Sequence, residues 1–145
     1  MIADAWEIVY YRQSNGDVPG LAFLDSCPPK VEATMTAVLD AVAVAPPPRF
    51  SGGGKWEAMH DEMAGIYEVR VQGPPNRSQY RLFCVLDNGS PDELAARGLA
   101  RPALAVVTGL VKPWQTIFKP EDYRRVQRLA ADYRSQHPRS IGTPP

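Results

Sequence analysis

The sequence predicts an α+β domain in which helices pack on one face of a twisted antiparallel sheet. Residues 66–71 alternate between apolar and polar side chains, which is the pattern of a half-buried strand. Residues 80–86 are almost continuously apolar, and the Gly-Pro-Pro-Asn turn before them indicates an antiparallel hairpin. Apolar residues also recur at helical spacing over 31–45 and again after Pro120, which predicts two amphipathic helices.

The N-terminal third is expected to contain one strand and one long helix. Residues 6–11 are aromatic and β-branched, so they predict a strand that ends at the polar turn 14–17. Residues 21–24 are a short apolar piece of about one helical turn. Ser26 is then expected to cap the helix that runs to residue 45, where three prolines end it. The apolar stripe of this helix consists of Val31, Met35, Val38, Leu39, Val42 and Ala45.

The C-terminal part is expected to add a buried strand and the last helix. Residues 103–111 are apolar on both faces, as in a fully buried strand, whereas residues 89–101 read as an inserted loop or a short helix. Pro120 opens the last helix, with Glu121 and Asp122 in its first turn, where negative charge suits the helix dipole. The domain therefore spans 1–137, and a disordered tail is expected over 138–145.

Composition excludes several classes of protein. Of the 145 residues, 44% are hydrophobic and 22% are charged, which is the balance of a globular rather than a disordered chain. No apolar run approaches the length of about 20 residues that a membrane-spanning helix needs, and no secretory signal is recognisable. Cys27 and Cys84 match no zinc or redox motif, so we expect two reduced, buried cysteines and a cytoplasmic protein.

The net charge of zero hides an asymmetry along the chain. Residues 1–100 hold 8 Lys and Arg against 13 Asp and Glu, whereas residues 101–145 hold 8 against 3. A basic C-terminal third suggests an acidic partner, such as nucleic acid or an acidic protein surface. The alternative is an ordinary solvated helix face.

The residues that could carry chemistry are cations at the edges of the predicted elements. Arg70 and Arg81 lie on the two arms of the hairpin, Lys112 ends the last strand, and Lys119 begins the last helix, one turn before Tyr123. Such groups bind a phosphate backbone and stabilise a pentavalent phosphate through charge-assisted hydrogen bonds. Two aromatic side chains between the lysines are suited to stacking on bases, namely Trp114 and Phe118.

Each of these residues also has a purely structural interpretation. Arg70 could pair with Glu68 on the strand surface, and Arg81 could form an ordinary salt bridge. Tyr123 lies on an apolar stripe, and the two aromatic residues before it could cap the core. No cluster of His, Cys or carboxylate residues has the spacing of a metal site, so neither a metal nor a cofactor is expected.

The order and spacing of four segments resemble the HigB branch of the RelE/ParE toxin superfamily, the phage-derived toxin-like group. The segments are Ile66-Tyr67-Glu68-Val69-Arg70, Tyr80-Arg81-Leu82-Phe83, Thr108-Gly109-Leu110-Val111-Lys112 and Lys119-Pro120. The likeness covers about residues 56–134. It implies the small RelE-like fold and a bacterial type II toxin that cleaves mRNA in the ribosomal A site without a metal ion. It also implies a cognate antitoxin, of helix-turn-helix type, as partner.

The resemblance assigns roles to individual residues. Arg81 matches the arginine that stabilises the phosphate, Lys112 and Lys119 match the two ends of the basic segment, and Tyr123 matches a C-terminal tyrosine. Arg70 matches the arginine of the first strand. RelE-like members carry lysines where this chain has Ile66 and Glu68, and no suitable histidine precedes His137.

These departures leave the general base open. His60 is one candidate, and Glu68 is the other if burial raises its pKa. The sequence therefore places Arg81, Lys112, Tyr123 and His60 at a catalytic centre, with Arg70, Lys119 and Trp114 binding the substrate.

Two other functions remain open from the sequence. One is a ParE-like protein that inhibits DNA gyrase and cuts no RNA. The other is a non-catalytic relic that keeps only antitoxin binding. Both share the expected fold and the basic C-terminal region.

Overall fold

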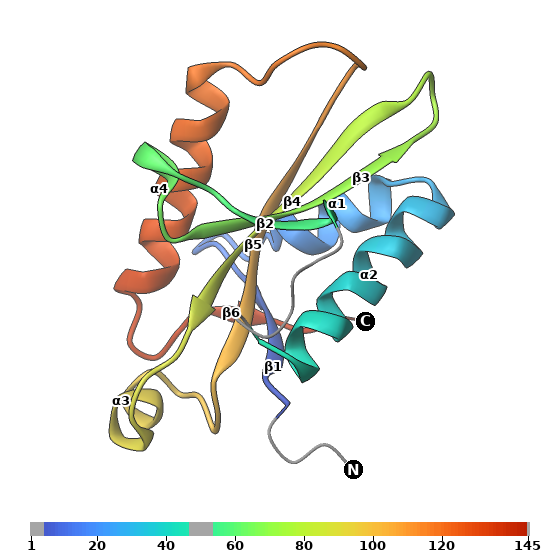
Figure 1. Ribbon diagram of the computed structural model, residues 1–145. Helices are drawn as coiled ribbons and strands as arrows, with labels where there is room; N and C mark the ends of the chain where they lie inside the picture. Colours follow the sequence, from blue (N-terminus) through green and yellow to red (C-terminus); the bar gives the residue numbers. More distant parts are fainter. Residues whose placement is uncertain (1–4, 47–53, 145) are drawn as a thin grey trace.

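A computed structural model describes residues 5–46 and 54–144 of the chain. In this part the fold is a mixed α+β structure, in which a six-stranded sheet, mostly antiparallel, is packed with four α-helices (Figure 1). The elements follow in the order β1 (Glu7–Tyr11), α1 (Pro19–Ser26), α2 (Pro29–Val44), β2 (Trp56–Ala58), a 3-10 turn (Asp61–Met63), β3 (Ile66–Gly73), β4 (Ser78–Asp87), α3 (Pro91–Ala96), β5 (Ala103–Lys112), α4 (Pro120–Ser135) and β6 (Ile141–Gly142). The predicted fold class is confirmed.

The strands lie in the order β2-β3-β4-β5-β1-β6. All neighbours are antiparallel except β1 and β5, which are parallel. The registers of β3, β4 and β5 fix the positions of the predicted site residues. Arg70 lies directly opposite Arg81, and Gln79 lies directly opposite Lys112.

Helices cover both faces of the sheet, so the prediction that they pack on one face was wrong. Alternate residues of β4 and β5 enter two separate cores, as Leu82 and Val106 do on one side and Phe83 and Val107 on the other. The first core contains residues of α1 and α2, and the second contains residues of α3 and α4. Figure 1 shows α2 and α4 on opposite sides of the strands. The physical reason is that strands apolar on both faces need cover on both.

The junction between the first two helices also differs from the prediction. Residues 21–24 belong to an eight-residue helix, α1, and Ser26 is its last residue rather than the cap of the next helix. The Ser26 hydroxyl donates to the Phe23 carbonyl oxygen at 2.6 Å. Pro28 therefore stands at the N-cap of α2, where its fixed φ suits the start of a helix.

The inserted segment and the tail are both ordered by specific contacts. Residues 91–96 form α3, whose Ser90 and Glu93 make a reciprocal capping box. The tail, expected to be disordered from residue 138, instead forms β6, in which Ile141 pairs with Tyr11 of β1. Arg139 is 5% exposed and forms an ion pair with Asp87 at 2.9 Å. These contacts hold the tail against the sheet.

The two cysteines are free and buried, as predicted. Cys27 and Cys84 both belong to the core between the sheet and the first two helices. Burial raises the pKa of the Cys27 thiol to about 11 and raises that of Cys84 further. Over residues 5–46 and 54–144, no helix is long and apolar enough to cross a membrane.

Candidate active site

Four of the predicted site residues come together on the sheet face that α4 also covers. Strand alternation turns Val69 and Val71 toward α1 and α2, so Arg70 between them faces the opposite side. Arg81 and Lys112 share that side, because their neighbours Leu82 and Val111 point the other way. The site is thus built on three adjacent strands, which hold side chains more firmly than loops do.

An aromatic wall from the start of α4 borders the cations. The Tyr123 ring meets Phe83 of β4 and Phe118 edge-on, with ring centroids 6.5 and 5.9 Å apart. The Lys112 Nζ lies 4.8 Å from the centroid of Phe118, within the range of a cation–π contact. Phe118 is therefore a buried packing residue beneath Lys112, not an exposed base-stacking platform.

Two carboxylates lie among the cations and partly neutralise them. Glu68 stands between the two guanidinium groups, with its oxygens 3.6 Å from Arg70 Nε and 3.9 Å from Arg81 Nε. Glu57 of β2 pairs with Arg70 Nη1 at 3.0 Å. We call the set Glu57, Glu68, Arg70, Arg81 and Lys112 the charged cluster. It carries three positive and two negative charges when all are ionised.

Arg81 is the most enclosed cation of the charged cluster. Its side chain is only 8% exposed, against 38% for Arg70. Its Nη2 donates to Gln79 Oε1 and its Nη1 to the Tyr80 carbonyl oxygen, both at 3.1 Å. Two hydrogen bonds and the nearby carboxylate thus fix the plane of the guanidinium.

Burial shifts the titration of the cluster in directions useful for proton transfer. It raises the pKa of Glu68 above the usual value near 4.5, although Arg81 and Arg70 pull it back. Burial also lowers the pKa of Lys112, and the positive charge of Arg81 adds to that effect. The pKa of Tyr123 is raised by burial and then by Glu68, so its hydroxyl stays protonated. Groups shifted in opposite directions within one site are candidates for a base and an acid.

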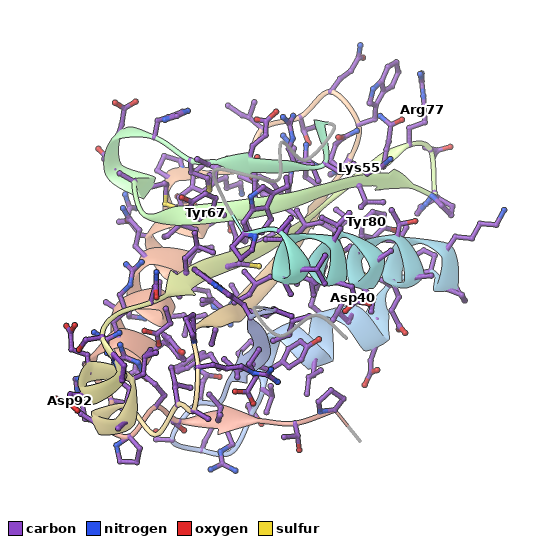
Figure 2. The ribbon with its side chains drawn as sticks, turned by 60° about the horizontal axis from the view of Figure 1, so that its bottom comes forward. Asp40, Lys55, Tyr67, Arg77, Tyr80 and Asp92 are labelled. Atoms are coloured by element: carbon purple, nitrogen blue, oxygen red, sulfur yellow. The ribbon has the colours of Figure 1, made fainter. Side chains whose placement is uncertain are left out.

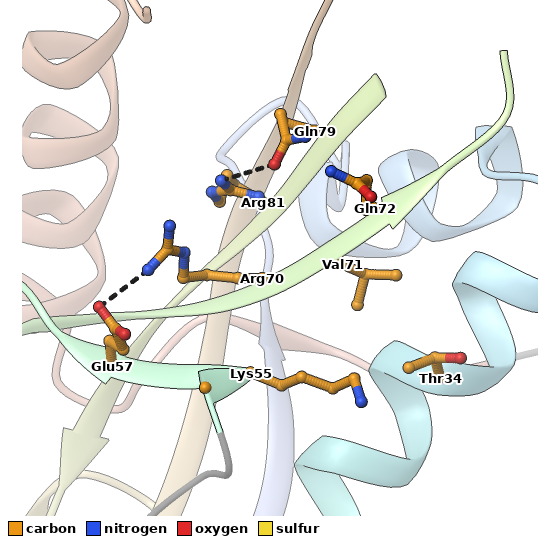
Figure 3. A pocket seen from close by; sticks show the side chains of 9 residues that line it. Thr34, Lys55, Glu57, Arg70, Val71, Gln72, Gln79 and Arg81 are labelled. Carbon is orange, nitrogen blue, oxygen red and sulfur yellow. Dashed lines mark hydrogen bonds and ion pairs between the residues drawn. The ribbon is translucent and has the colours of Figure 1, made fainter. Parts of the chain in front are cut away.

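A depression of about 690 Å³ gives access to the cluster from the side of β2 and β3 (Figure 3). Figure 3 shows Arg70 and Arg81 side by side above it, with Lys55 reaching across toward Thr34 of α2. The lining residues are Thr34, Gly54, Lys55, Glu57, Arg70, Val71, Gln72, Gln79 and Arg81. Lys55 adds a further cation to this opening.

The remaining predicted residues lie outside the charged cluster. His60 is exposed before the 3-10 turn, and among the described residues no hydrogen bond or ion pair joins its imidazole to the cluster. Lys119 is exposed at the N-cap of α4, where its backbone N–H donates to Asp122 at 3.0 Å. Trp114 stacks instead against Arg77, whose Cζ lies 3.5 Å from the ring centroid.

Sequence reasoning missed Glu57, Gln79 and Arg77. Glu57 joins the site because the short strand β2 pairs with β3 and places it opposite Glu68. A three-residue strand leaves little periodic signal. Gln79 could have been found from the alternation of β4, since it lies two residues before Arg81. Arg77 is the last residue of the turn between β3 and β4, and nothing local indicates its contact with Trp114.

No group of three or more His, Cys, Asp or Glu side chains within the described ranges is placed to hold a metal ion. Comparisons with protein-family models, with curated proteins and with solved structures found no match for this chain.

Proposed function

We propose that this chain is the toxin of a type II toxin–antitoxin pair and that it cleaves mRNA on the ribosome without a metal ion. The observation that carries the proposal is the convergence of Arg70, Arg81 and Lys112 from three neighbouring strands, beside Tyr123. A cluster of fixed donors of this kind is suited to the charge that develops on a phosphate during transfer. The resemblance of the same segments to HigB-like toxins points to RNA as the substrate.

The cluster supplies each group that RNA cleavage needs. A ribose 2′-oxygen attacks the adjacent phosphorus while Glu68 accepts the 2′-hydroxyl proton. The bond from phosphorus to the 5′-oxygen then breaks, and Lys112 donates a proton to that leaving oxygen. The products are a 2′,3′-cyclic phosphate and a 5′-hydroxyl end. Arg70 and Arg81 stabilise the non-bridging oxygens, and the Tyr123 hydroxyl orients the attacking ribose.

Glu68 replaces His60 as the general base in this proposal. A base must lie within hydrogen-bond reach of the proton it removes, directly or through one water molecule. Glu68 stands next to the cations that would hold the phosphate, whereas His60 has no contact with them among the described residues. The proposed function implies two partners, the ribosome with its mRNA and a helix-turn-helix antitoxin. It also implies a cytoplasmic location.

Inducible expression in a bacterium tests the proposal. We expect translation to stop within minutes and new mRNA ends to appear at codon-spaced positions. Combining Arg81→Met with Lys112→Ala should abolish both effects, since loss of one such donor costs about a hundredfold to a thousandfold in rate. Methionine fills about the same buried space as the aliphatic part of the Arg81 side chain but carries no charge. Arg124→Ala, on the exposed face of α4, is the matched control and should remain toxic.

The other outcomes are distinct. Filamentation and DNA damage with intact mRNA would point to a ParE-like inhibitor of gyrase. Harmless expression of a chain that still binds an antitoxin would point to a relic. Full toxicity of the double variant would contradict the assignment of the charged cluster.

A further inference from the structure

The stack of Arg77 on Trp114 lies just beyond the paired ends of β4 and β5, close in sequence to Lys112 of the charged cluster. The pairing of β4 with β5 ends at Gln79 and Lys112, and Arg77 and Trp114 each lie two residues beyond that pair. The guanidinium carbon of Arg77 lies 3.5 Å from the indole centroid of Trp114. The stack therefore lies at the end of the two strands that carries Lys112.

The stack has the chemistry of a site for a nucleobase. Trp114 is 41% exposed and is one of the few large apolar residues at the surface of the described part of the chain. Arg77 covers one face of the ring and adds positive charge at the turn between β3 and β4, where Figure 2 shows it projecting from the hairpin. Aromatic rings that hold bases of single-stranded nucleic acid combine such an exposed π surface with nearby cations.

We propose that Trp114 and Arg77 form a base-stacking subsite for the mRNA strand that enters the charged cluster. This inference rests on the proposed function. One nucleotide near the scissile phosphate leaves its neighbours, and its base lies against the Trp114 indole while Arg77 contacts the ring and the RNA backbone. The subsite contributes to holding the strand and takes no part in the chemical step.

The test is single-turnover cleavage of a 5′-labelled mRNA on programmed bacterial ribosomes, measured against the concentration of the full-length protein. Trp114→Ala should raise the half-saturating concentration about fivefold to a hundredfold, which is the loss expected for one stacked base. The rate at saturation should stay within about twofold, and Trp114→Phe should restore most of the affinity. Ile117→Ala, which removes an 87% exposed apolar side chain from the same loop, is the matched control and should behave like the wild type.

A second series of cleavage experiments identifies which nucleobase of the mRNA stacks on Trp114. The mRNA is made with a single abasic nucleotide at successive positions around the cleavage site. At one position, the abasic nucleotide should raise the half-saturating concentration of the wild-type protein by the same factor as Trp114→Ala does. The same abasic nucleotide should leave the half-saturating concentration of the Trp114→Ala variant unchanged. Arg77→Lys should give an intermediate loss, since lysine keeps the charge but not the planar stack.

The outcomes separate this inference from the proposed function. If the wild-type protein cleaves mRNA but Trp114→Ala saturates at the same concentration, the subsite is refuted and the proposed function stands. If the variant keeps its cleavage curve but loses antitoxin binding, the stack is a protein contact and the subsite is refuted. If the wild-type protein cleaves no mRNA, both fail together.

Discussion

At the scale of single residues, the pairing of Arg70 with Arg81 is the feature that needs an explanation. The two lie directly opposite each other in β3 and β4, and like charges in that position repel. Glu68 and Glu57 offset part of the repulsion. One positive charge of the cluster is still uncompensated, so a phosphate group would find a site already arranged for it.

Glu68→Gln tests the role of the carboxylate. We expect the cleavage rate at saturation to fall about a hundredfold to ten-thousandfold, as for loss of a general base. In the wild type a base must be ionised to act, so the rate should rise with pH through the Glu68 pKa, which burial raises above its usual value near 4.5. This rise should disappear in the variant. Glu62→Gln, in the exposed 3-10 turn, should keep the wild-type profile, and an unchanged profile in Glu68→Gln would contradict the role.

Asp87 is a second charged residue whose neighbours determine its pKa, and its role is structural. Its carboxylate accepts hydrogen bonds from Tyr133 at 2.6 Å and Arg139 at 2.9 Å, and it also pairs with Arg97 at 2.9 Å. Burial alone would raise its pKa, but the hydrogen bonds from Arg139 and Tyr133 outweigh burial and lower it below 3.8. The carboxylate of Asp87 in β4 thus binds the C-cap of α3, α4 and the tail.

This arrangement predicts how stability depends on pH. A carboxyl whose pKa is lowered by folding stabilises the protein above its unfolded pKa, and that contribution is lost as the pH falls through the folded value. The Asp87 contribution should therefore be complete at neutral pH and decline below about pH 4. Asp87→Asn should lower the free energy of unfolding by roughly 3–5 kcal/mol at pH 7, because it removes the negative charge that compensates the largely enclosed side chains of Arg139 and Arg97.

Chemical denaturation at several pH values measures both effects. The difference between the wild type and Asp87→Asn should shrink toward pH 3. Asp25→Asn changes an exposed carboxylate at the end of α1 and serves as the control, with little change at any pH. A constant difference across the pH range would rule out the carboxylate as the source.

At the scale of elements, the close approach of α1 to β5 depends on missing side chains, and Gly109 of β5 is the tightest case. Leu82 of β4 lies opposite Gly109 of β5, on the face packed by α1 and α2. A Cβ added at Gly109 would lie 2.1 Å from the nearest atom of the Phe23 ring. The ring fills the space over the glycine, so this glycine allows the helix to pack closely on the strand.

Gly109→Ala should therefore cost about 1–3 kcal/mol of stability, as overpacking does. The cost depends on the Phe23 ring, so Gly109→Ala in a Phe23→Ala background should add little. A double-mutant cycle measured by thermal or chemical unfolding gives the coupling between the two positions. Additive costs would show that backbone strain at Gly109, rather than the ring, is responsible.

At the scale of the whole molecule, the sequence predicts most of the sheet and part of the site. Strong periodic patterns identify β3, β4, β5, α2 and α4, and the alternation in the hairpin correctly places Arg70 and Arg81 on one side. The sequence predicts helices on one face, whereas β4 and β5, which are apolar on both faces, are covered on both.

The parts of the fold and of the site that the sequence does not predict depend on long-range contacts, which leave little local signal. His60 reads as an ordered candidate base, but at the start of the 3-10 turn it forms no hydrogen bond or ion pair with the charged cluster among the described residues. Glu57 enters the site only because β2 pairs with β3. The tail reads as disordered because its pairing with β1 and its ion pair with Asp87 join it to residues far away in the sequence.

The position of β1 in the sheet has a consequence for synthesis of the protein. β1 is made first, yet both of its neighbours come much later, since Glu7 pairs with Ala103 of β5 and Tyr10 with Gly142 of β6. β3 and β4, joined by a tight turn, can pair as soon as they leave the ribosome. The first strand must wait with both edges unpaired until β5 has emerged. A ribosome that stops before β5 therefore releases a chain whose leading strand is open to aggregation or proteolysis.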